Sequence, residues 1–459
     1  DMWRAGVIFA LLFGLAASFG AGGKRTLVIL QDLSIQRTHS QFFADLDERG
    51  HELDFHAADE SGIALQKYGE WFYDNVILFA PQARRFAGLQ VSDFVDFIDA
   101  GGNILQAVDN KLSKANRQLA SECGVDYDTK GTLVLDHFLY DGADPHNDHS
   151  LIHATHFANA EPVTGNLHKA NPSRVNPVLY RGIGHAVNSD NILAVRAMTG
   201  AATTYSAFAD QAIEDYPQSA GKETLLVTGV QARNNARLLF AGSLDMFSDA
   251  LFDITPMRGA TGRELESNHN RNFCKSISQW VFAERGVLRF SNVRHVRADG
   301  TQPEVQLHER EQPDLPESLF PDPEIARSTL VYRVKDDVLY SIDIEEYRDG
   351  QWQPFQADDV QLEFVMLNPY VRTNLSPDEH GTFSAEFTVP DVYGIYQFRV
   401  LYRRPGYSVL HSTTQVSVRP FRHNEFERFI SSAYPYYASA FTMMAGFFVF
   451  SGMFLYTKD

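Results

Sequence analysis

Histidine and aspartate side chains are concentrated in residues 141–156, where they could supply metal ligands or acid–base groups. The segment contains three aspartates and four histidines, namely Asp141, Asp144, Asp148, His146, His149, His153 and His156. Imidazole and carboxylate groups are common zinc ligands, but this spacing matches no established zinc pattern. The glycine, proline and asparagine residues among them are typical of a surface loop. We therefore predict a polar loop without a bound metal or cofactor.

Ser243 and Cys123 are the side chains best placed to act as nucleophiles. Ser243 follows an apolar run in the sequence Ala-Gly-Ser-Leu-Asp, and Cys123 lies in Ser-Glu-Cys-Gly-Val. A catalytic serine or cysteine on a strand-to-helix turn needs flanking glycines and a nearby base. Neither G-x-S-x-G nor G-x-C-x-G occurs, and no spacing connects Ser243 to one of the 16 histidines. We predict a tight turn and helix cap at Ser243, and no catalytic residue in this chain.

The chain has two cysteines, Cys123 and Cys274, which allow one disulfide at most. This count excludes a disulfide scaffold and a multi-thiolate zinc site. One bridge or two buried free thiols are the alternatives.

The C-terminal region contains an uncharged stretch over residues 438–456, with tyrosines before it and Lys458 after it. Its length and its flanking residues predict a transmembrane helix over residues 434–456, followed by a cytoplasmic tail at 457–459. Five residues recur at the spacing i, i+4, i+7, i+11 and i+14, namely Ala438, Thr442, Ala445, Val449 and Gly452. Four of them are small, and small residues allow helices to approach closely in lipid. We predict that this stripe packs against a partner helix.

The N-terminal 23 residues have the pattern of a secretory signal peptide. Arg4 precedes an apolar stretch over residues 5–19, and small residues follow at 20–23. The pattern predicts a type I protein with a lumenal body. The positive-inside rule points the other way, because Arg419, Arg422 and Arg428 all precede the span. Large translocated domains tolerate such charges, so the signal peptide decides the expected orientation.

Composition narrows the class of protein. The chain has 459 residues, of which 44% are hydrophobic, and its formal net charge is −18. These values indicate a folded protein of about three units rather than a disordered one. The acidic balance argues against nucleic acid as a partner, since phosphate backbones require a basic face.

Residues 24–285 alternate between short apolar runs and helical patterns. Runs rich in β-branched residues occur at 26–30, 51–56, 75–80, 103–108, 225–228 and 237–241, with helical spacing at 40–49, 91–100 and 272–284. This alternation predicts βαβ units around a parallel sheet, with an inserted lobe at about 140–225.

Residues 286–425 have a different pattern. Short strand-like runs follow one another between turns rich in proline, glycine and aspartate, and no helical period is present. This part predicts an antiparallel β-sandwich.

Six stretches in one order carry a resemblance to a known family. They are KRTLVILQDL (24–33), FIDAGGNIL (97–105), ARNNARLLFAGSLDMFSD (232–249), QLEFVMLNPYVRT (361–373), PDVYGIYQFRV (390–400) and STTQVSVRP…ERFISSAYPYYASAF (412–441). The chain resembles the large type I accessory subunits of the eukaryotic oligosaccharyltransferase, of about 48 kilodaltons in animals.

The resemblance implies an α/β domain like class I glutamine amidotransferases but catalytically empty, a lumenal β-domain and a span in the endoplasmic reticulum. It implies a non-catalytic role in assembling and stabilising the complex that transfers a lipid-linked oligosaccharide to asparagine in N-x-S/T sequons. The implied partners are a catalytic multispanning subunit, ribophorin-like subunits and small membrane subunits.

Two other functions compete with this interpretation. One is a membrane-tethered lumenal hydrolase or amidotransferase that uses Ser243 or Cys123. The other is a lumenal sorting or lectin-type binding module, for which the small face of the span would have no role.

Overall fold

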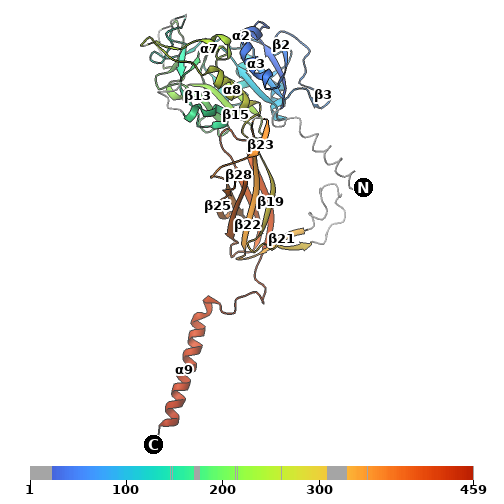
Figure 1. Ribbon diagram of the computed structural model, residues 1–459, viewed down its shortest axis with the longest axis vertical. Helices are drawn as coiled ribbons and strands as arrows, with labels where there is room; N and C mark the ends of the chain where they lie inside the picture. Colours follow the sequence, from blue (N-terminus) through green and yellow to red (C-terminus); the bar gives the residue numbers. More distant parts are fainter. Residues whose placement is uncertain are drawn as a thin grey trace.

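The computed structural model describes residues 23–457, except positions 145, 147, 170–175, 212, 214–215, 260, 308–327 and 349. The expected signal peptide lies outside the described residues apart from Gly23, and so does Lys458. Three parts follow one another along the long axis of the molecule (Figure 1). We call them the α/β body (residues 25–282), the β-sandwich (residues 287–419) and the C-terminal helix α9 (Tyr434–Tyr456).

A twisted sheet forms the centre of the α/β body. Its parallel part has the order β2 (Glu52–Ala57), β1 (Arg25–Leu30), β5 (Asn75–Phe79), β6 (Asn103–Ala107) and β16 (Arg237–Ala241). The runs predicted as strands at residues 26–30, 51–56, 75–80 and 103–108 all lie here. Buried β-branched and leucine residues without a polar face favour strands that are covered on both sides.

Helices cover both faces of this sheet, so the body has three layers. They are α3 (Ser40–Glu48) and α8 (Asn270–Val281) on one face, and α4 (Val91–Asp99) and α5 (Lys114–Glu122) on the other. Side chains of β1 alternate between the two cores, with Val28 packing on the α3–α8 side and Ile29 on the α4–α5 side. This alternation is the period of two that a strand requires.

The sheet continues beyond β16 with antiparallel strands, where the alternation pattern had predicted a parallel sheet. These strands are β15 (Leu225–Gln231), β13 (Ala194–Thr199), β10 (His156–Phe157), β12 (His185–Val187) and β7 (Val125–Tyr127). Residues 232–236 join β15 to β16. A parallel crossover needs about a dozen residues, so this short connection enforces a hairpin.

Short elements complete the body. Two-stranded sheets pair β3 (Gln66–Lys67) with β4 (Glu70–Trp71), β8 (Leu133–Leu135) with β14 (Tyr205–Ala207), β9 (Ile152–Ala154) with β11 (Val178–Tyr180), and β17 (Met257–Arg258) with β18 (Arg263–Glu264). The short helices are α2 (Ile35–Thr38), α6 (Glu161–Thr164), α7 (Asp249–Asp253), η1 (Gly165–Lys169), η2 (Gly221–Glu223) and η3 (Asp245–Phe247).

Two sheets pack face to face in the β-sandwich. One has β19 (Val287–Arg297), β22 (Asp337–Arg348), β27 (Thr382–Thr388), β26 (Ser376–Pro377) and β23 (Gln351–Pro354). The other has the order β20 (Glu304–Leu307), β21 (Ser328–Arg333), β29 (Leu410–Arg419), β28 (Gly394–Tyr402), β24 (Gln361–Val365) and β25 (Pro369–Asn374). The rings of Tyr340 and Phe398 stack across the core with centroids 5.3 Å apart.

One pair of strands departs from the predicted antiparallel arrangement. β21 runs parallel to β29, with Arg333 opposite Arg419. The two strands are far apart in sequence, so no turn fixes their relative direction. Both end at this Arg333–Arg419 pair, from which the chain continues to α9.

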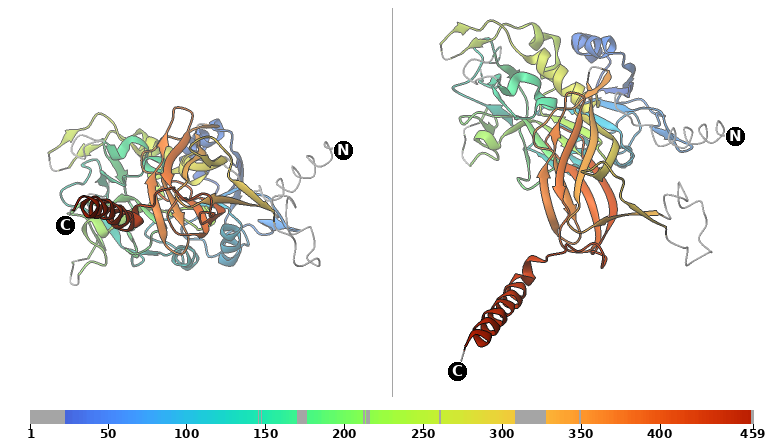
Figure 2. Two further views of the ribbon diagram at one scale, coloured as in Figure 1. Left: turned by 90° about the horizontal axis from the view of Figure 1, so that it is seen from below. Right: turned by 60° about the horizontal axis from the view of Figure 1, so that its bottom comes forward.

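A compact junction connects the body to the sandwich. The Arg237 guanidinium is buried and donates hydrogen bonds to the carbonyl oxygens of Trp280, Arg285 and Gly286. The Trp280 indole donates to the Gly406 carbonyl at 2.8 Å. Contacts from three segments far apart in sequence therefore hold the two parts together, and the further views show them in direct contact (Figure 2).

Candidate functional site

The carboxyl ends of the parallel strands are the edge where this sheet order usually places ligands. The order changes direction between β1 and β5. There the Gln82 backbone N–H donates to Gln31 Oε1 at 3.0 Å, and the Lys111 N–H donates to Asp109 Oδ1 at 2.8 Å. Burial raises the pKa of Asp109 despite the hydrogen bond that its carboxylate accepts from the Lys111 N–H. The polar groups of this edge are thus engaged with neighbouring backbone.

Ser243 follows β16 at the same edge, where the predicted turn and cap are observed. Its Oγ donates to the Arg181 carbonyl at 2.6 Å and accepts from the Met246 N–H at 3.1 Å. His39 lies nearby, but its Nε2 faces the Leu244 carbonyl at 3.3 Å, and burial lowers its pKa. In the described part of the chain, the Ser243 hydroxyl is thus engaged by backbone groups rather than by an imidazole.

The two cysteines are free thiols. Burial raises the pKa of Cys123 to about 12, with a further contribution from Glu122. Cys274 is buried on α8, where its Sγ contacts the Met246 carbonyl, and burial raises its pKa well above the ordinary value. A nucleophilic cysteine requires a lowered pKa, so both environments work against catalysis.

The histidine- and aspartate-rich loop is held together mainly by hydrogen bonds that its carboxylates make to nearby groups of the protein. Asp141 is buried, accepts from the Ala143 and Met257 N–H groups, and lies 2.7 Å from His153 Nε2. Asp148 accepts from the backbone and hydroxyl of Ser150. These carboxylates hold the loop's own backbone in place.

One further contact of this loop reaches outside it. His137 Nδ1 lies 2.5 Å from His149 Nδ1, and its Nε2 lies 2.6 Å from the Tyr205 hydroxyl. Sequence reasoning missed His137, because it precedes the cluster and meets His149 only through the fold. No three His, Cys, Asp or Glu side chains converge on a metal position among the described residues.

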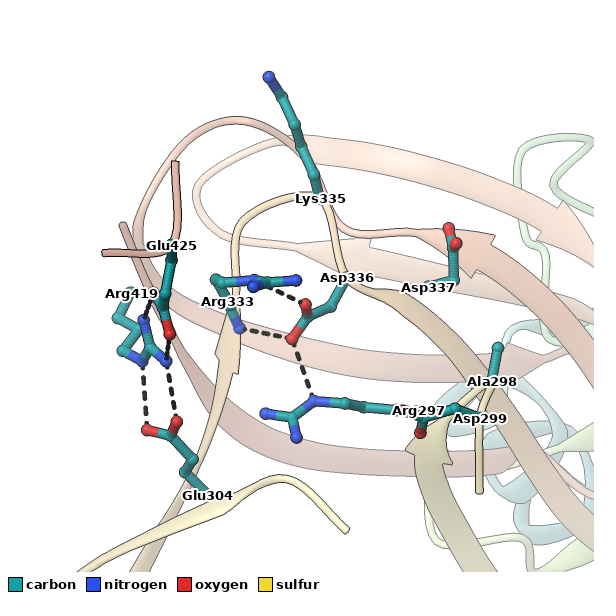
Figure 3. A pocket seen from close by; sticks show the side chains of 10 residues that line it. All are labelled: Arg297, Ala298, Asp299, Glu304, Arg333, Lys335, Asp336, Asp337, Arg419 and Glu425. Carbon is teal, nitrogen blue, oxygen red and sulfur yellow. Dashed lines mark hydrogen bonds and ion pairs between the residues drawn. The ribbon is translucent and has the colours of Figure 1, made fainter. Parts of the chain in front are cut away.

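A charged cavity of about 360 Å³ opens at the end of the sandwich near the exit toward α9. Arg297 and Arg333 both donate to Asp336, at 3.1 and 3.0 Å from their Nε atoms (Figure 3). Arg419 makes paired hydrogen bonds to Glu304 and to Glu425, on two sides of its guanidinium (Figure 3). The opposite charges are matched, so the cavity has little excess charge to offer a ligand.

Helix α9 has the length and composition of a membrane span. Its 23 residues have no acidic or basic side chain and extend about 34 Å at 1.5 Å per residue, enough for a hydrocarbon core. An 18-residue window within residues 431–456 has a mean hydropathy of 1.7, and none of this window is buried by the rest of the protein. The helix stands apart from the folded parts (Figure 1).

The five stripe residues occupy one side of α9. At 100° per residue, each of the five lies within about 40° of their mean direction around the helix axis. An added Cβ at Gly452 would meet no atom within 4 Å. The Thr442 hydroxyl donates to the Ala438 carbonyl at 2.7 Å, so its polar group is satisfied within the helix. The stripe is thus a smooth, apolar surface that none of the described residues of this chain covers.

Comparison with known proteins gives a consistent picture over nearly the whole chain. The family model described as "OST48, N-terminal domain" matches residues 17–284, and "OST48 middle domain" matches residues 321–458. Three relatives are each named "Dolichyl-diphosphooligosaccharide–protein glycosyltransferase 48 kDa subunit". They come from Danio rerio, Drosophila melanogaster and Arabidopsis thaliana, with identities of 43%, 42% and 40%. The matches cover 98%, 100% and 95% of this chain and 96%, 97% and 93% of the relatives.

Likeness to solved structures is slight. A carbohydrate deacetylase, Agd3, matches 58% of this chain and 33% of its own with a TM-score of 0.31 at 10% identity. A putative ThuA-like protein from Parabacteroides merdae matches 57% of this chain and 90% of its own with a TM-score of 0.27 at 14% identity. Neither carries an argument about fold or activity. The family models and the near full-length relatives show that the chain belongs to the OST48 family.

Proposed function

We propose that this chain is a subunit of the oligosaccharyltransferase that transfers oligosaccharide from a dolichyl diphosphate carrier to asparagine in N-x-S/T sequons. The observation that carries the proposal is the identity of 40–43% to three proteins bearing the 48 kDa subunit name. Because the matches span both chains almost completely, the body, the sandwich and the C-terminal helix all have counterparts in those relatives.

We propose a non-catalytic role within the complex, in its assembly and stability. The hydroxyl of Ser243 is engaged by Arg181 and Met246, and burial suppresses the thiolate forms of Cys123 and Cys274. These environments disfavour the hydrolase and amidotransferase alternatives. A catalytically empty amidotransferase-like domain over residues 24–285 is consistent with the sheet order of the body, and a separate β-domain over 286–425 with the two packed sheets.

We propose that the chain is a type I protein of the endoplasmic reticulum, with its body and sandwich in the lumen. The signal-peptide pattern of residues 1–23 and the span α9 support this orientation. The proposed partners are a catalytic multispanning subunit, ribophorin-like subunits and small membrane subunits. The stripe formed by Ala438, Thr442, Ala445, Val449 and Gly452 is the proposed contact with a partner helix.

Co-purification tests this function directly. Tagged full-length chain is extracted from membranes in a mild detergent, and the eluate is analysed by mass spectrometry and assayed for glycan transfer to an N-x-T peptide. We expect stoichiometric recovery of a multispanning glycosyltransferase together with transfer activity.

The same assay on Ser243→Ala and Cys123→Ala separates a scaffold from an enzyme. We expect both variants to retain the transfer activity per mole of assembled complex. Recovery of the chain alone, or a loss of activity in either variant with assembly intact, would contradict the proposed role.

A further inference from the structure

Apolar side chains project from the end of the sandwich that faces α9. Two loops at this end, residues 366–368 and 391–393, we call the end loops. Leu367 is 90% exposed and Tyr393 is 68% exposed, and Ile395 at the start of β28 is 59% exposed. Leu367 and Tyr393 of the end loops therefore lie outside the core. Exposed apolar groups gathered in one place usually mark an interaction site.

The strand register places both loops at the exit of the chain. Gly394 pairs with Val418 near the end of β29, whereas Tyr402 pairs with Leu410 at the end that meets the α/β body. Strand β24 reaches Val365 beside Gln397, so the turn after it points the same way as residues 391–393. Both loops thus share an end with Arg419, from which the chain continues to α9.

The connector to α9 keeps this end close to the first turn of the helix. Its first part is bound to the sandwich, because Glu425 is paired with Arg419 and the Arg333 guanidinium lies 5.2 Å from the centre of the Phe421 ring. The 3-10 turn η6 (Ser431–Ala433) then leads directly into α9. The six steps from Glu425 to Ser431 can span about 22 Å at most, at 3.3–3.6 Å per residue.

The connector itself has the composition of a membrane interface. Phe426, Phe429 and Ile430 are exposed, and the Arg428 guanidinium lies 5.5 Å from the centre of the Phe429 ring. Tyr434 and Tyr436 continue the aromatic series into the first turn of α9. Aromatic residues flanked by arginine are typical of the headgroup level of a bilayer.

Charge at this end does not oppose contact with lipid. The cations of the cavity in Figure 3 are paired with Asp336, Glu304 and Glu425. Lys335 is paired at 3.1 Å with Asp391, the first residue of the second end loop. The charges at this end are therefore largely neutralised in pairs.

We propose that the end loops and the connector enter the headgroup layer of the membrane that α9 crosses, so that the sandwich rests on the bilayer. The occupant of this apolar surface is lipid, and residues Leu367, Tyr393, Ile395 and Phe429 are its main contacts. The proposal requires only that α9 spans a membrane, and it is independent of the partners in the complex.

A polarity-sensitive probe tests the proposal on the full chain. Single cysteines at Leu367→Cys and Ile395→Cys are labelled with a nitrobenzoxadiazole dye, and the chain is reconstituted in phosphatidylcholine vesicles with or without headgroup-labelled nitroxide lipid. Background labelling is measured on the parent chain, whose two thiols have raised pKa values. We expect shorter emission wavelengths and strong nitroxide quenching at both sites.

Leu401→Cys is the matched control. It lies six residues along β28 from Ile395, on the same face and with a similar exposure of 53%, but roughly 20 Å nearer the α/β body. Quenching several-fold stronger at 395 than at 401 supports the proposal. Equal quenching at the two sites overturns it. Probes that lose water contact only in membranes containing the other subunits, without nitroxide quenching, also overturn it and assign the surface to a protein.

Discussion

Glu284 shows how single residues fix one corner of the α/β body. Its carboxylate lies 2.6 Å from Lys24 Nζ, 2.8 Å from an Arg49 nitrogen and 2.7 Å from His51 Nε2. Burial by itself would raise the pKa of Glu284, but the His51 hydrogen bond and the charges of Arg49 and Lys24 outweigh it and hold the pKa at about 2. Burial lowers the pKa of His51, so the imidazole acts as a neutral donor.

This network makes the stability of the body depend on pH. An unfolded glutamate titrates near 4.3, so the depressed pKa of Glu284 contributes stability above that pH, and the contribution is lost as the pH falls toward 2. Between pH 7 and pH 3, we expect the free energy of unfolding to fall by roughly 2 kcal/mol more in the parent chain than in Glu284→Gln. Denaturant unfolding of the detergent-solubilised chain at the two pH values measures the difference.

Glu223 supplies the control for this measurement. It pairs with Arg196 at 3.3 Å on the surface, where an ion pair contributes little. Glu223→Gln should therefore follow the parent chain at both pH values. If acid lowers the free energy of unfolding of Glu284→Gln as much as that of the parent chain, the pH dependence does not come from Glu284.

Residue roles set by local sequence were predictable, and those set by distant partners were not. The cap at Ser243 follows from a glycine-serine turn after a strand, and the structure has it. Glu284 gave no such signal, because its partner His51 lies 233 residues away. The pairing of His137 with His149 likewise depends on backbone hydrogen bonds between residues 136–141 and 149–153.

At the scale of elements, the small stripe of α9 is the feature with a direct test. Ala445→Leu combined with Gly452→Leu adds bulk to the stripe, and we expect the chain to separate from its proposed membrane partners while its body and sandwich remain folded, because close helix approach is lost. Co-purification in mild detergent measures the association. Circular dichroism and protease resistance report the fold.

Phe447→Leu combined with Phe454→Leu is the matched control, since these residues lie about 180° and 160° from Ala438 around the helix at 100° per residue. We expect normal association in this variant. Unchanged association in the stripe variant, or equal loss in both, would exclude the stripe as the contact.

The sequence predicted where strands and helices occur better than how the strands pair. The apolar runs at β1, β5, β6 and β16 were predicted within one or two residues, because composition and periodicity are local properties. The antiparallel direction of β15 and the parallel pairing of β21 with β29 depend on packing between distant segments. The stripe was visible in sequence, but the helix proposed to cover it was not, because that helix is proposed to come from another chain.

At the scale of the whole molecule, Gly286 is central to the junction between body and sandwich. Its φ of +66° suits glycine, and an added Cβ would lie 2.5 Å from the Gly406 carbonyl oxygen and 2.8 Å from Pro162 Cβ. The Gly286 carbonyl also accepts from the Arg237 guanidinium and from the Ser408 N–H. A side chain here would force the two parts apart.

Gly286→Ala should therefore destabilise the chain more than the strained backbone alone explains. Gly300→Ala is the control, because Gly300 has a φ of +81° but no atom within 4 Å of an added Cβ. We expect a loss of about 1–2 kcal/mol for Gly300→Ala, and about 1–3 kcal/mol beyond that for Gly286→Ala through overpacking. Thermal unfolding compares them. Equal losses of stability in the two variants would mean that the junction accommodates the added methyl group at little energetic cost.

The position of β29 in its sheet has a consequence for the order of events during synthesis. This strand lies between β21 and β28, yet it is the last strand of the sandwich to leave the ribosome. Until then β21 and β28 each present an open edge, the kind of surface that invites wrong pairing. The sandwich therefore closes only as the segment leading to α9 is translated, so completion of the fold and arrival of the membrane anchor are nearly simultaneous. A nascent chain halted before residue 410 would retain both open edges and be a natural client for chaperones.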